Sequence, residues 1–217
     1  MSPATSGPSP QVFLASRNAK KIEEMDRILR AAMADVGGEV SVLGLDDVAT
    51  YDEPVEDEPT FEANALLKAR AGFRVTGLPA IADDSGLCVD ALNGMPGVLS
   101  ARWSGPPKDD ARNNTLLLHQ LADVPDERRA AHFTCAVAFV HEAGEVVVHG
   151  RMDGTVLRET HGEGGFGYDV LFVADDLPGR TTAELSRAEK DAVSHRGRAL
   201  RELAPHVAGL LAGSRAR

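Results

Sequence analysis

Two adjacent carboxylates, Asp83 and Asp84, follow the small apolar residues at 80–82 and precede Ser85 and Gly86. Neighbouring carboxylates at the end of a strand are costly unless a cation or hydrogen-bond donors meet them. Mg²⁺ prefers oxygen ligands and is usually bound by one or two carboxylates together with substrate phosphates. One carboxylate of such a pair can instead act as a general base on water. The alternative interpretation is an Asp-rich turn that bends at Gly86.

A second polar segment, residues 16–21, lies between an apolar run and a helix-like pattern. A strand that turns into a helix there places free N–H groups and the positive end of the helix dipole at one point. Ser16 and Asn18 add polar side chains, and Lys20 and Lys21 add cations. The segment predicts a phosphate site, and the alternative is an ordinary capped helix whose lysines lie in water.

The segment 162–167 is rich in glycine, and the aromatic residues Phe166 and Tyr168 stand among and after the glycines. Glycine is used where the backbone adopts unusual dihedral angles or approaches a ligand closely. The aromatic rings suggest a surface on which a flat ring can stack, and Asp169 supplies an acceptor. The alternative is a flexible surface loop, for which Phe and Tyr are poor choices.

A fourth cluster contains Lys190 and the sequence Ser194-His195-Arg196-Gly197. Lys190 and His195 are too far apart in phase to share one face of an unbroken helix. Either Ser194 caps a new helix that aims His195 and Arg196 at a site, or only some of these residues reach it. The alternative is a charged helix surface.

The composition argues against several classes of protein. The chain of 217 residues carries 23 Lys and Arg against 33 Asp and Glu, a net charge of −10. We therefore expect no nucleic-acid partner, because gripping that backbone requires many basic contacts. Two cysteines are too few for a disulfide framework or a structural zinc site. No apolar run approaches the roughly 18 residues of a membrane span, so we expect no membrane partner.

Residues 1–10 have neither the basic nor the apolar part of a secretory signal. We expect them to form a flexible tail, and we expect the protein in the cytoplasm. Residues 11–212 then form one domain.

Apolar periodicity assigns the elements that must position these residues. Strands are expected at 12–15, 40–45, 80–82, 133–140 and 146–149, with an apolar run at 170–173. The strand that begins at residue 80 is expected to break at 83–86 and to resume at 87–92. Helices are expected from the N-cap Asn18 to Gly37, at 60–75, at 109–121, and from Ala188 or Ser194 to Leu211. This interleaving predicts an α/β fold with one antiparallel hairpin in a mixed sheet.

Together the four segments resemble the inosine/xanthosine triphosphate pyrophosphatase family, which hydrolyses nonstandard purine nucleoside triphosphates to the monophosphate and pyrophosphate. The family's Ser/Thr-x-Asn-x-x-Lys turn stands here as Ser16, Asn18 and Lys21. Its Ala-Asp-Asp-Ser-Gly-Leu, Gly-Gly-Phe-Gly-Tyr-Asp and Ser-His-Arg-Gly motifs stand at 82–87, 164–169 and 194–197. The resemblance runs from residue 12 to about residue 210 and implies a single α/β domain with a mixed, elongated β-sheet flanked by helices.

The resemblance implies a Mg²⁺-dependent enzyme in which Asp84 is the catalytic proton acceptor and a metal ligand. A second metal contact falls on Glu56, four residues before Thr60, although the neighbouring Asp57 and Glu58 leave the register open. The implied substrate-binding residues are Ser16, Arg17, Asn18, Ala19, Lys20, Lys21, Ser85, Phe166, Gly167, Tyr168, Asp169, Lys190, His195 and Arg196. Family members are typically dimeric, so a homodimer is expected, and their activity removes ITP, dITP and XTP before deaminated purines enter DNA or RNA.

These inferences combine into one hypothesis. Water attacks the α-phosphorus and pyrophosphate leaves, while Lys21, Lys190 and the first helix N-terminus stabilise the growing charge. A guanidinium such as Arg196 can donate to O6 and N7 of hypoxanthine or xanthine but meets an amino group in adenine. The rival is a purine nucleotide sensor without hydrolysis, which the paired aspartates argue against. A P-loop enzyme lacks its signature sequence here, and a glycosidase has no use for the Lys/Asn turn.

Overall fold

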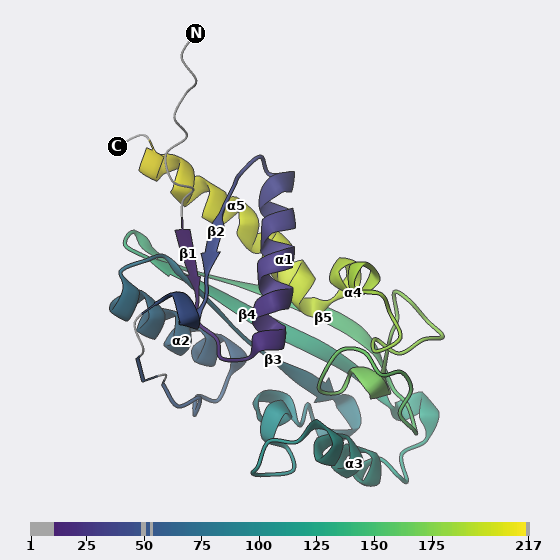
Figure 1. Cartoon of the computed structure of the whole chain (residues 1–217). Coiled ribbons are helices and arrows are strands. Elements are labelled where there is room, and N and C mark those ends of the chain that lie inside the picture. Colours follow the sequence, from purple (N-terminus) through teal and green to yellow (C-terminus); the bar gives the residue numbers. More distant parts are fainter. Residues whose placement is uncertain (1–10, 49–50, 53, 216–217) are drawn as a thin grey trace.

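The computed structural model describes residues 11–48, 51–52 and 54–215. Six strands of the described part form one mixed sheet in the order β2-β1-β3-β4-β5-β6 (Figure 1). Their bounds are β1 Gln11–Leu14, β2 Ser41–Leu43, β3 Ala80–Val89, β4 Ala130–His141, β5 Gly144–Val156 and β6 Phe172–Ala174. β1 pairs in parallel with β2 and β3, and the other pairs are antiparallel. The expected α/β class, the mixed sheet and the β4–β5 hairpin are confirmed.

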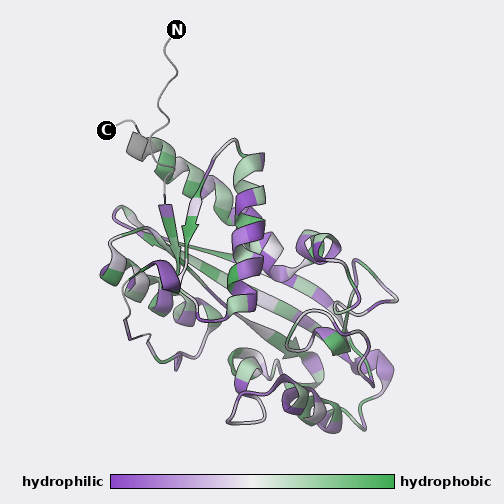
Figure 2. Ribbon diagram, in the orientation of Figure 1, coloured by the Kyte–Doolittle hydropathy of each residue, from purple (hydrophilic) through white to green (hydrophobic). Residues whose placement is uncertain are grey.

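Helices cover both faces of the upper part of the sheet in Figure 1. α1 (Ala19–Asp35) and α5 (His195–Arg215) pack on one face, where Ile81, Val137 and Phe139 contribute to the core. α2 (Phe61–Thr76) packs on the other face, against alanines at 80, 82, 136 and 138. Successive strand residues point to opposite faces. Ile81 therefore packs in the core beneath α1 and α5, while its neighbours Ala80 and Ala82 pack in the core beneath α2. The strands carry hydrophobic residues along much of their length (Figure 2).

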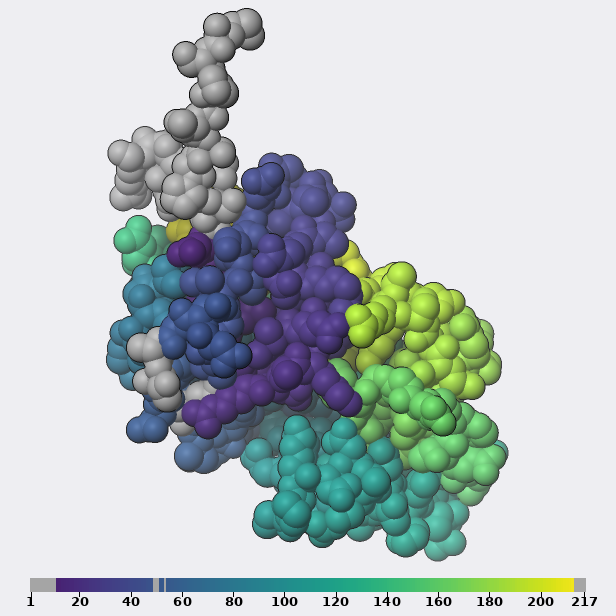
Figure 3. Space-filling view, in the orientation of Figure 1, coloured from purple at the N-terminus to yellow at the C-terminus, as the bar shows by residue number. Residues whose placement is uncertain are grey.

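A separate core lies at the far end of β3, β4 and β5. There Leu87, Phe133 and Met152 pack with Leu117 of α3 (Asp110–Gln120) and with residues around β6. The long central strands β3, β4 and β5 therefore run from the two cores beneath α1, α5 and α2 into this third core and join them. In the space-filling view the surface is hollowed between the purple start of α1 and the teal region that contains α3 (Figure 3).

Local capping explains where the predicted helices begin. The Asn18 side chain accepts a hydrogen bond from the N–H of Lys21, and the Thr60 side chain accepts one from the N–H of Ala63. The last helical segment divides into α4 (Arg187–Val193) and α5, and Ser194 lies between them. The Ser194 hydroxyl accepts from the N–H of Gly197, so the interpretation that Ser194 caps a new helix is confirmed.

The predicted break at 83–86 is wrong, because β3 continues through it. Asp83, Asp84, Ser85 and Gly86 stay in register with 137, 136, 135 and 134 of β4. A strand can carry these charged residues without breaking because their side chains find partners on other elements, as described below. The predicted strand at 40–45 is shorter, at 41–43, and the strand at 146–149 is part of the longer β5. The predicted tail at 1–10 lies outside the described residues.

No helix of the described part is both long and apolar enough to cross a membrane.

Gly150 of β5 lets the start of α5 pack against the sheet. A Cβ there would overlap the carbonyl oxygen of His195 and lie 2.7 Å from the amide nitrogen of Ala199, both backbone atoms. We expect Gly150→Ala to lower the free energy of unfolding by at least about 2 kcal/mol, because the clash cannot be relieved by a side-chain rotation. Gly209→Ala, a change at an open position of α5, should instead be neutral or stabilise by about 0.5–1 kcal/mol. Urea denaturation measures both, and equal stability of the two variants would contradict this account.

Candidate active site

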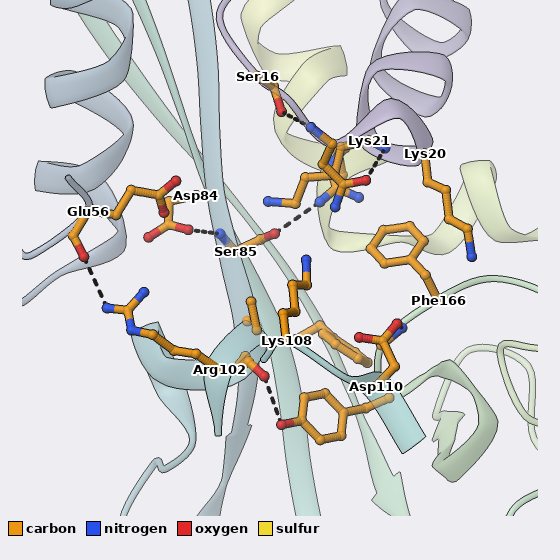
Figure 4. A pocket seen from close by; sticks show the side chains of 18 of the residues that line it. Ser16, Lys20, Lys21, Glu56, Asp84, Ser85, Arg102, Lys108, Asp110 and Phe166 are labelled. Atoms are coloured by element: carbon orange, nitrogen blue, oxygen red, sulfur yellow. Dashed lines mark hydrogen bonds between the residues drawn. The ribbon is translucent and has the colours of Figure 1, made fainter. Parts of the chain in front are cut away.

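A cleft of about 630 Å³ lies between the start of α1 on one side and the start of α3 on the other. Its wall combines the start of α1, the middle of β3, the start of α3, the loop before residue 169 and the start of α5 (Figure 4). The predicted site residues that line it are Ser16, Arg17, Asn18, Ala19, Lys20, Lys21, Glu56, Asp84, Ser85, Phe166, Gly167, Tyr168, Asp169, His195 and Arg196. Segments far apart in the sequence therefore meet at one place.

Lys190 is the predicted site residue that does not line the cleft directly. Its Nζ bonds to Asp169 Oδ2 and lies 5.0 Å from the centre of the Phe166 ring. Lys190 therefore acts on the cleft through these two residues, behind the loop that carries them.

The start of α1 presents polar groups to the cleft. The N–H of Asn18 donates to Ser16 Oγ at 3.3 Å, and Asn18 caps the helix. Lys20 Nζ donates to the carbonyl oxygen of Gly165 at 3.3 Å, while Lys21 Nζ lies 3.1 Å from Asp83 Oδ2. Helix N–H groups, the helix dipole and two lysines meet here, which is an arrangement suited to phosphate.

Asp83 and Asp84 have opposite surroundings because they alternate across β3. Asp83 Oδ2 accepts from Lys21 Nζ, from Nε and Nη2 of Arg196 and from Ser85 Oγ. Although burial acts to raise the pKa of Asp83, the charges of Lys21 and Arg196 lower it well below the usual range. Asp83 is therefore an ionised anchor beneath the cleft.

Asp84 faces the cleft from the other side of the strand. Its Oδ1 accepts from the N–H of Ser85 at 2.9 Å, and its Oδ2 accepts from Asn64 Nδ2 at 3.0 Å. Lys68 Nζ lies 4.0 Å from Asp84 Oδ1 and 3.2 Å from Glu56 Oε1. Burial raises the pKa of Asp84, and the charges of Lys68 and Lys21 counteract this. A buried carboxylate with a raised pKa is suited to accept a proton.

The carboxylates of Glu56 and Asp84 together fit a magnesium ion. Glu56 and Asp84 lie side by side in Figure 4, with Lys68 close to both carboxylates. Asp57 and Glu58 are not among the residues that line the cleft. Among the described residues, no three His, Cys, Asp or Glu side chains form a cluster that could hold a metal. Two carboxylates completed by water and phosphate oxygens are what Mg²⁺ usually takes, so the donor set suits it.

The glycine-rich loop holds one aromatic ring toward the cleft and buries the other. The N–H of Phe166 donates to Asp169 Oδ2 at 2.8 Å. Figure 4 shows the Phe166 ring between Lys20 and Asp110. Tyr168 is buried, and its hydroxyl donates to the carbonyl oxygen of Ser100 at 2.9 Å. Phe166 is thus the better placed of the two rings for stacking.

Arg196 is buried, and most of its N–H groups donate hydrogen bonds within the protein. Its Nη1 donates to Glu24 Oε2 at 2.7 Å, and its Nη2 donates to both Asp83 Oδ2 and Ser85 Oγ. With the Nε bond to Asp83, four of the five N–H groups of a guanidinium have protein partners. One N–H on Nη1 is left, so Arg196 has little capacity for a two-point contact with O6 and N7.

His195 brings an unpaired ring nitrogen to the same end of the cleft. Its ring stacks on Phe133 with centres 5.0 Å apart, and its buried Nδ1 has no hydrogen-bond partner among the described residues. Burial, with the charges of Arg196 and Lys190, holds the pKa of His195 well below its usual value. His195 is therefore neutral near pH 7 and offers either a donor or an acceptor to a ligand.

Lys68 is a cleft residue that sequence reasoning missed. It follows Asn64 by four residues, and this spacing places both on the helix face that contacts Asp84. The spacing is the signal that could have revealed it. The other lining residues that were not predicted are Gly86, Val98, Ser100, Ala101, Arg102, Lys108, Asp110 and Phe133.

Comparison with known proteins places the chain among close relatives. Residues 12–206 match the model of the Ham1 family. A Mycolicibacterium paratuberculosis protein named dITP/XTP pyrophosphatase is 61% identical over 194 residues, which are 89% of this chain and 94% of the relative. A crystal structure of nucleoside-triphosphatase / dITP/XTP pyrophosphatase from Mycobacterium abscessus is 54% identical with a TM-score of 0.71, covering 90% of this chain and 99% of that one. The Staphylococcus aureus Ham1 structure is 35% identical with a TM-score of 0.78, covering 92% and 98%.

Proposed function

The chain belongs to the Ham1 family, and from this premise we propose that it hydrolyses the nonstandard purine nucleoside triphosphates ITP, dITP and XTP to monophosphate and pyrophosphate. One observation carries the proposal: the carboxylates of Asp84 and Glu56 and the polar start of α1 share a cleft with the Phe166 ring. The names of the relatives, dITP/XTP pyrophosphatase, support the same reaction. The role of the protein is then to remove deaminated purine nucleotides before they are incorporated into nucleic acid.

The layout of the cleft supports one orientation of the substrate. The phosphates lie toward the α1 N-terminus, Lys20 and Lys68, and the purine lies toward Phe166 and His195. An acidic protein needs such local cations because its net charge of −10 would otherwise repel a polyanion. Arg102 and Lys108 line the same cleft and add positive charge.

Asp84 is the proton acceptor in this proposal. Water attacks the α-phosphorus, the bond to the bridging oxygen breaks, and pyrophosphate leaves with that oxygen. The proton of the attacking water passes to the Asp84 carboxylate, a buried acceptor on the wall of the cleft. The helix N–H groups and Lys20 stabilise the charge that grows on the leaving pyrophosphate. This role was expected of Lys21 and Lys190, which instead pair with Asp83 and Asp169.

Glu56 and Asp84 would hold Mg²⁺, which when bound supplies Lewis-acid stabilisation of phosphate charge. We expect Glu56→Gln to raise the Mg²⁺ concentration for half-maximal activity by roughly tenfold, because one anionic ligand is lost. Asp57→Asn removes the same charge from an exposed neighbour outside the cleft and is the matched control. Magnesium titration of ITP hydrolysis measures both variants. An equal shift in both would assign the effect to general charge and not to ligation.

Base selectivity is proposed to come from the unpaired groups at the purine end. Arg196 retains one N–H, and His195 Nδ1 has no partner among the described residues. The oxygen at C6 of hypoxanthine or xanthine can accept a hydrogen bond from such a group of the protein. The amino group at C6 of adenine cannot, so the protein donor stays unpaired, and an unpaired buried donor is costly.

A panel of purine triphosphates tests this function. With Mg²⁺, we expect pyrophosphate release from ITP, dITP and XTP at kcat/KM values at least about 100-fold above that for ATP. Release of orthophosphate, equal turnover of ATP, or binding without turnover would each refute the proposal, the last in favour of a nucleotide sensor. The homodimer and the cytoplasmic location stay predictions.

A further inference from the structure

The loop that carries Phe166 lies outside regular secondary structure, so its shape depends on side chains that bond to its backbone. One side is held from the turn before β6, the loop after β6 and α4. Asp169 Oδ2 accepts from the N–H of Phe166 and from Lys190 Nζ, and Asp169 Oδ1 accepts from Thr182 Oγ1 at 2.8 Å. These contacts fix the end of the loop at residue 169. They do not fix the backbone N–H and carbonyl group of Gly167, which follows Phe166 directly.

Two side chains of α3 hold these two groups. Asp110 Oδ2 accepts from the N–H of Gly167 at 2.7 Å, and Asn114 Nδ2 donates to the Gly167 carbonyl oxygen at 2.9 Å. The two residues are four apart, so they occupy the same face of the helix. Together they bind the donor and the acceptor of one glycine residue, and we call them the Asp110–Asn114 clamp.

The position of Gly167 makes this clamp effective. Gly167 has a φ of +63°, a left-handed conformation that sets the direction of the chain between Phe166 and Tyr168. Glycine holds such a conformation weakly by itself because many other backbone states are open to it. Two bonds of opposite polarity fix the orientation of the residue as well as its place. Asn114 is buried and Asp110 lines the cleft, so water competes little with the Asn114 bond.

We propose that Asp110 and Asn114 are positioning residues for the purine end of the cleft, acting through the Gly167 backbone to hold the Phe166 ring where a purine stacks. The inference rests on the proposed function and deepens it. The clamp acts on the nucleoside half of the substrate, because the cations assigned to the phosphates belong mainly to α1 and α2. It also makes the start of α3 part of the purine site.

The two reaction products separate these halves. Binding of inosine monophosphate probes the purine end, and binding of inorganic pyrophosphate probes the phosphate end, each by calorimetry with Mg²⁺ present. We expect Asp110→Ala and Asn114→Asp each to weaken inosine monophosphate binding by roughly tenfold, because each removes a buried or charged hydrogen bond to the loop. Pyrophosphate binding should change by less than about twofold, because neither substitution removes a cation, and the exposed bond from Lys20 to Gly165 contributes little.

Matched variants distinguish positioning from a general effect on the helix. Asp110→Asn keeps an acceptor for the Gly167 N–H and should recover most of the loss. Asp109→Asn removes the same charge one residue earlier, at the N-cap of α3, where Asn caps as well as Asp. It should bind both products as the wild type does.

Each outcome decides the matter. The clamp is refuted if pyrophosphate binding falls as much as inosine monophosphate binding, if Asp109→Asn matches Asp110→Ala, or if both clamp variants bind inosine monophosphate normally. The proposed function fails separately, in the wild type, if ITP yields no inosine monophosphate and pyrophosphate. A wild type that hydrolyses ITP together with unaffected clamp variants would remove the clamp and leave the function standing.

Discussion

Asp84→Asn is expected to reduce the turnover of ITP by about 10²–10⁴-fold, the range that a general base contributes. The neutral amide cannot accept the proton of the attacking water and is a poor ligand for Mg²⁺. The fold should survive, because the single oxygen of the Asn side chain can still accept one of the two bonds that now reach Asp84, from Asn64 or from the N–H of Ser85. Burial of the charge raises the pKa of Asp84, so removing it should not lower stability.

The measurement is kcat for pyrophosphate release, with thermal unfolding recorded on the same sample. Asp90→Asn is the matched control, since Asp90 is an exposed carboxylate just beyond the end of β3 and outside the cleft. Wild-type turnover by Asp84→Asn would remove this carboxylate from the mechanism. A variant that loses both activity and its folding transition would show that Asp84 is needed for the fold.

Arg196→Leu is expected to lower the free energy of unfolding by about 3–5 kcal/mol, the usual cost of removing one partner from a buried ion pair. The guanidinium is the partner of the buried carboxylates of Asp83 and Glu24. Each of these carboxylates already has one oxygen without a hydrogen-bond partner among the described residues. The variant would leave Glu24 uncompensated and Asp83 dependent on Lys21.

Arg198→Leu provides the comparison two residues further along α5. Its ion pair with Asp176 is partly exposed on both sides, and such pairs contribute about 0–1 kcal/mol. Urea denaturation at pH 7 gives the midpoint and the slope for both variants. Similar midpoints for Arg196→Leu and Arg198→Leu would contradict the view that Arg196 neutralises a buried acidic cluster.

Local signals predicted much of the fold. Asn18 and Thr60 cap the helices that follow them, and the β4–β5 hairpin follows its turn residues, because these effects act over a few neighbours. The continuity of β3 could not be predicted in the same way. The partners that allow Asp83 to stay in a strand are Lys21 and Arg196, 62 and 113 residues away in the chain.

For the site, too, the sequence predicted which residues take part better than it predicted how their side chains are arranged. The motifs predicted 15 of the 24 residues that line the cleft, but not how Asp83 and Asp84 divide their tasks. That division follows from alternation along an unbroken strand, where the sequence predicted a break at 83–86. Arg196 was interpreted as a reader of the purine, whereas most of its donors serve Asp83, Glu24 and Ser85. Asp110 and Asn114 gave no signal, because their partner Gly167 is more than 50 residues away.

The ladder between β3 and β4 passes without interruption beneath the cleft, from residue 80 to residue 89. Its amides at the level of Asp84 lie between two cores, so hydrogen–deuterium exchange there should require the whole sheet to open. The loop at 162–167 has no such ladder, so its bonded amides, such as those of Phe166 and Gly167, exchange when single bonds open locally. The reacting carboxylate thus lies on backbone that is exposed only when the sheet opens, whereas the backbone at the purine end depends on the separate side-chain bonds from Asp110, Asn114 and Asp169.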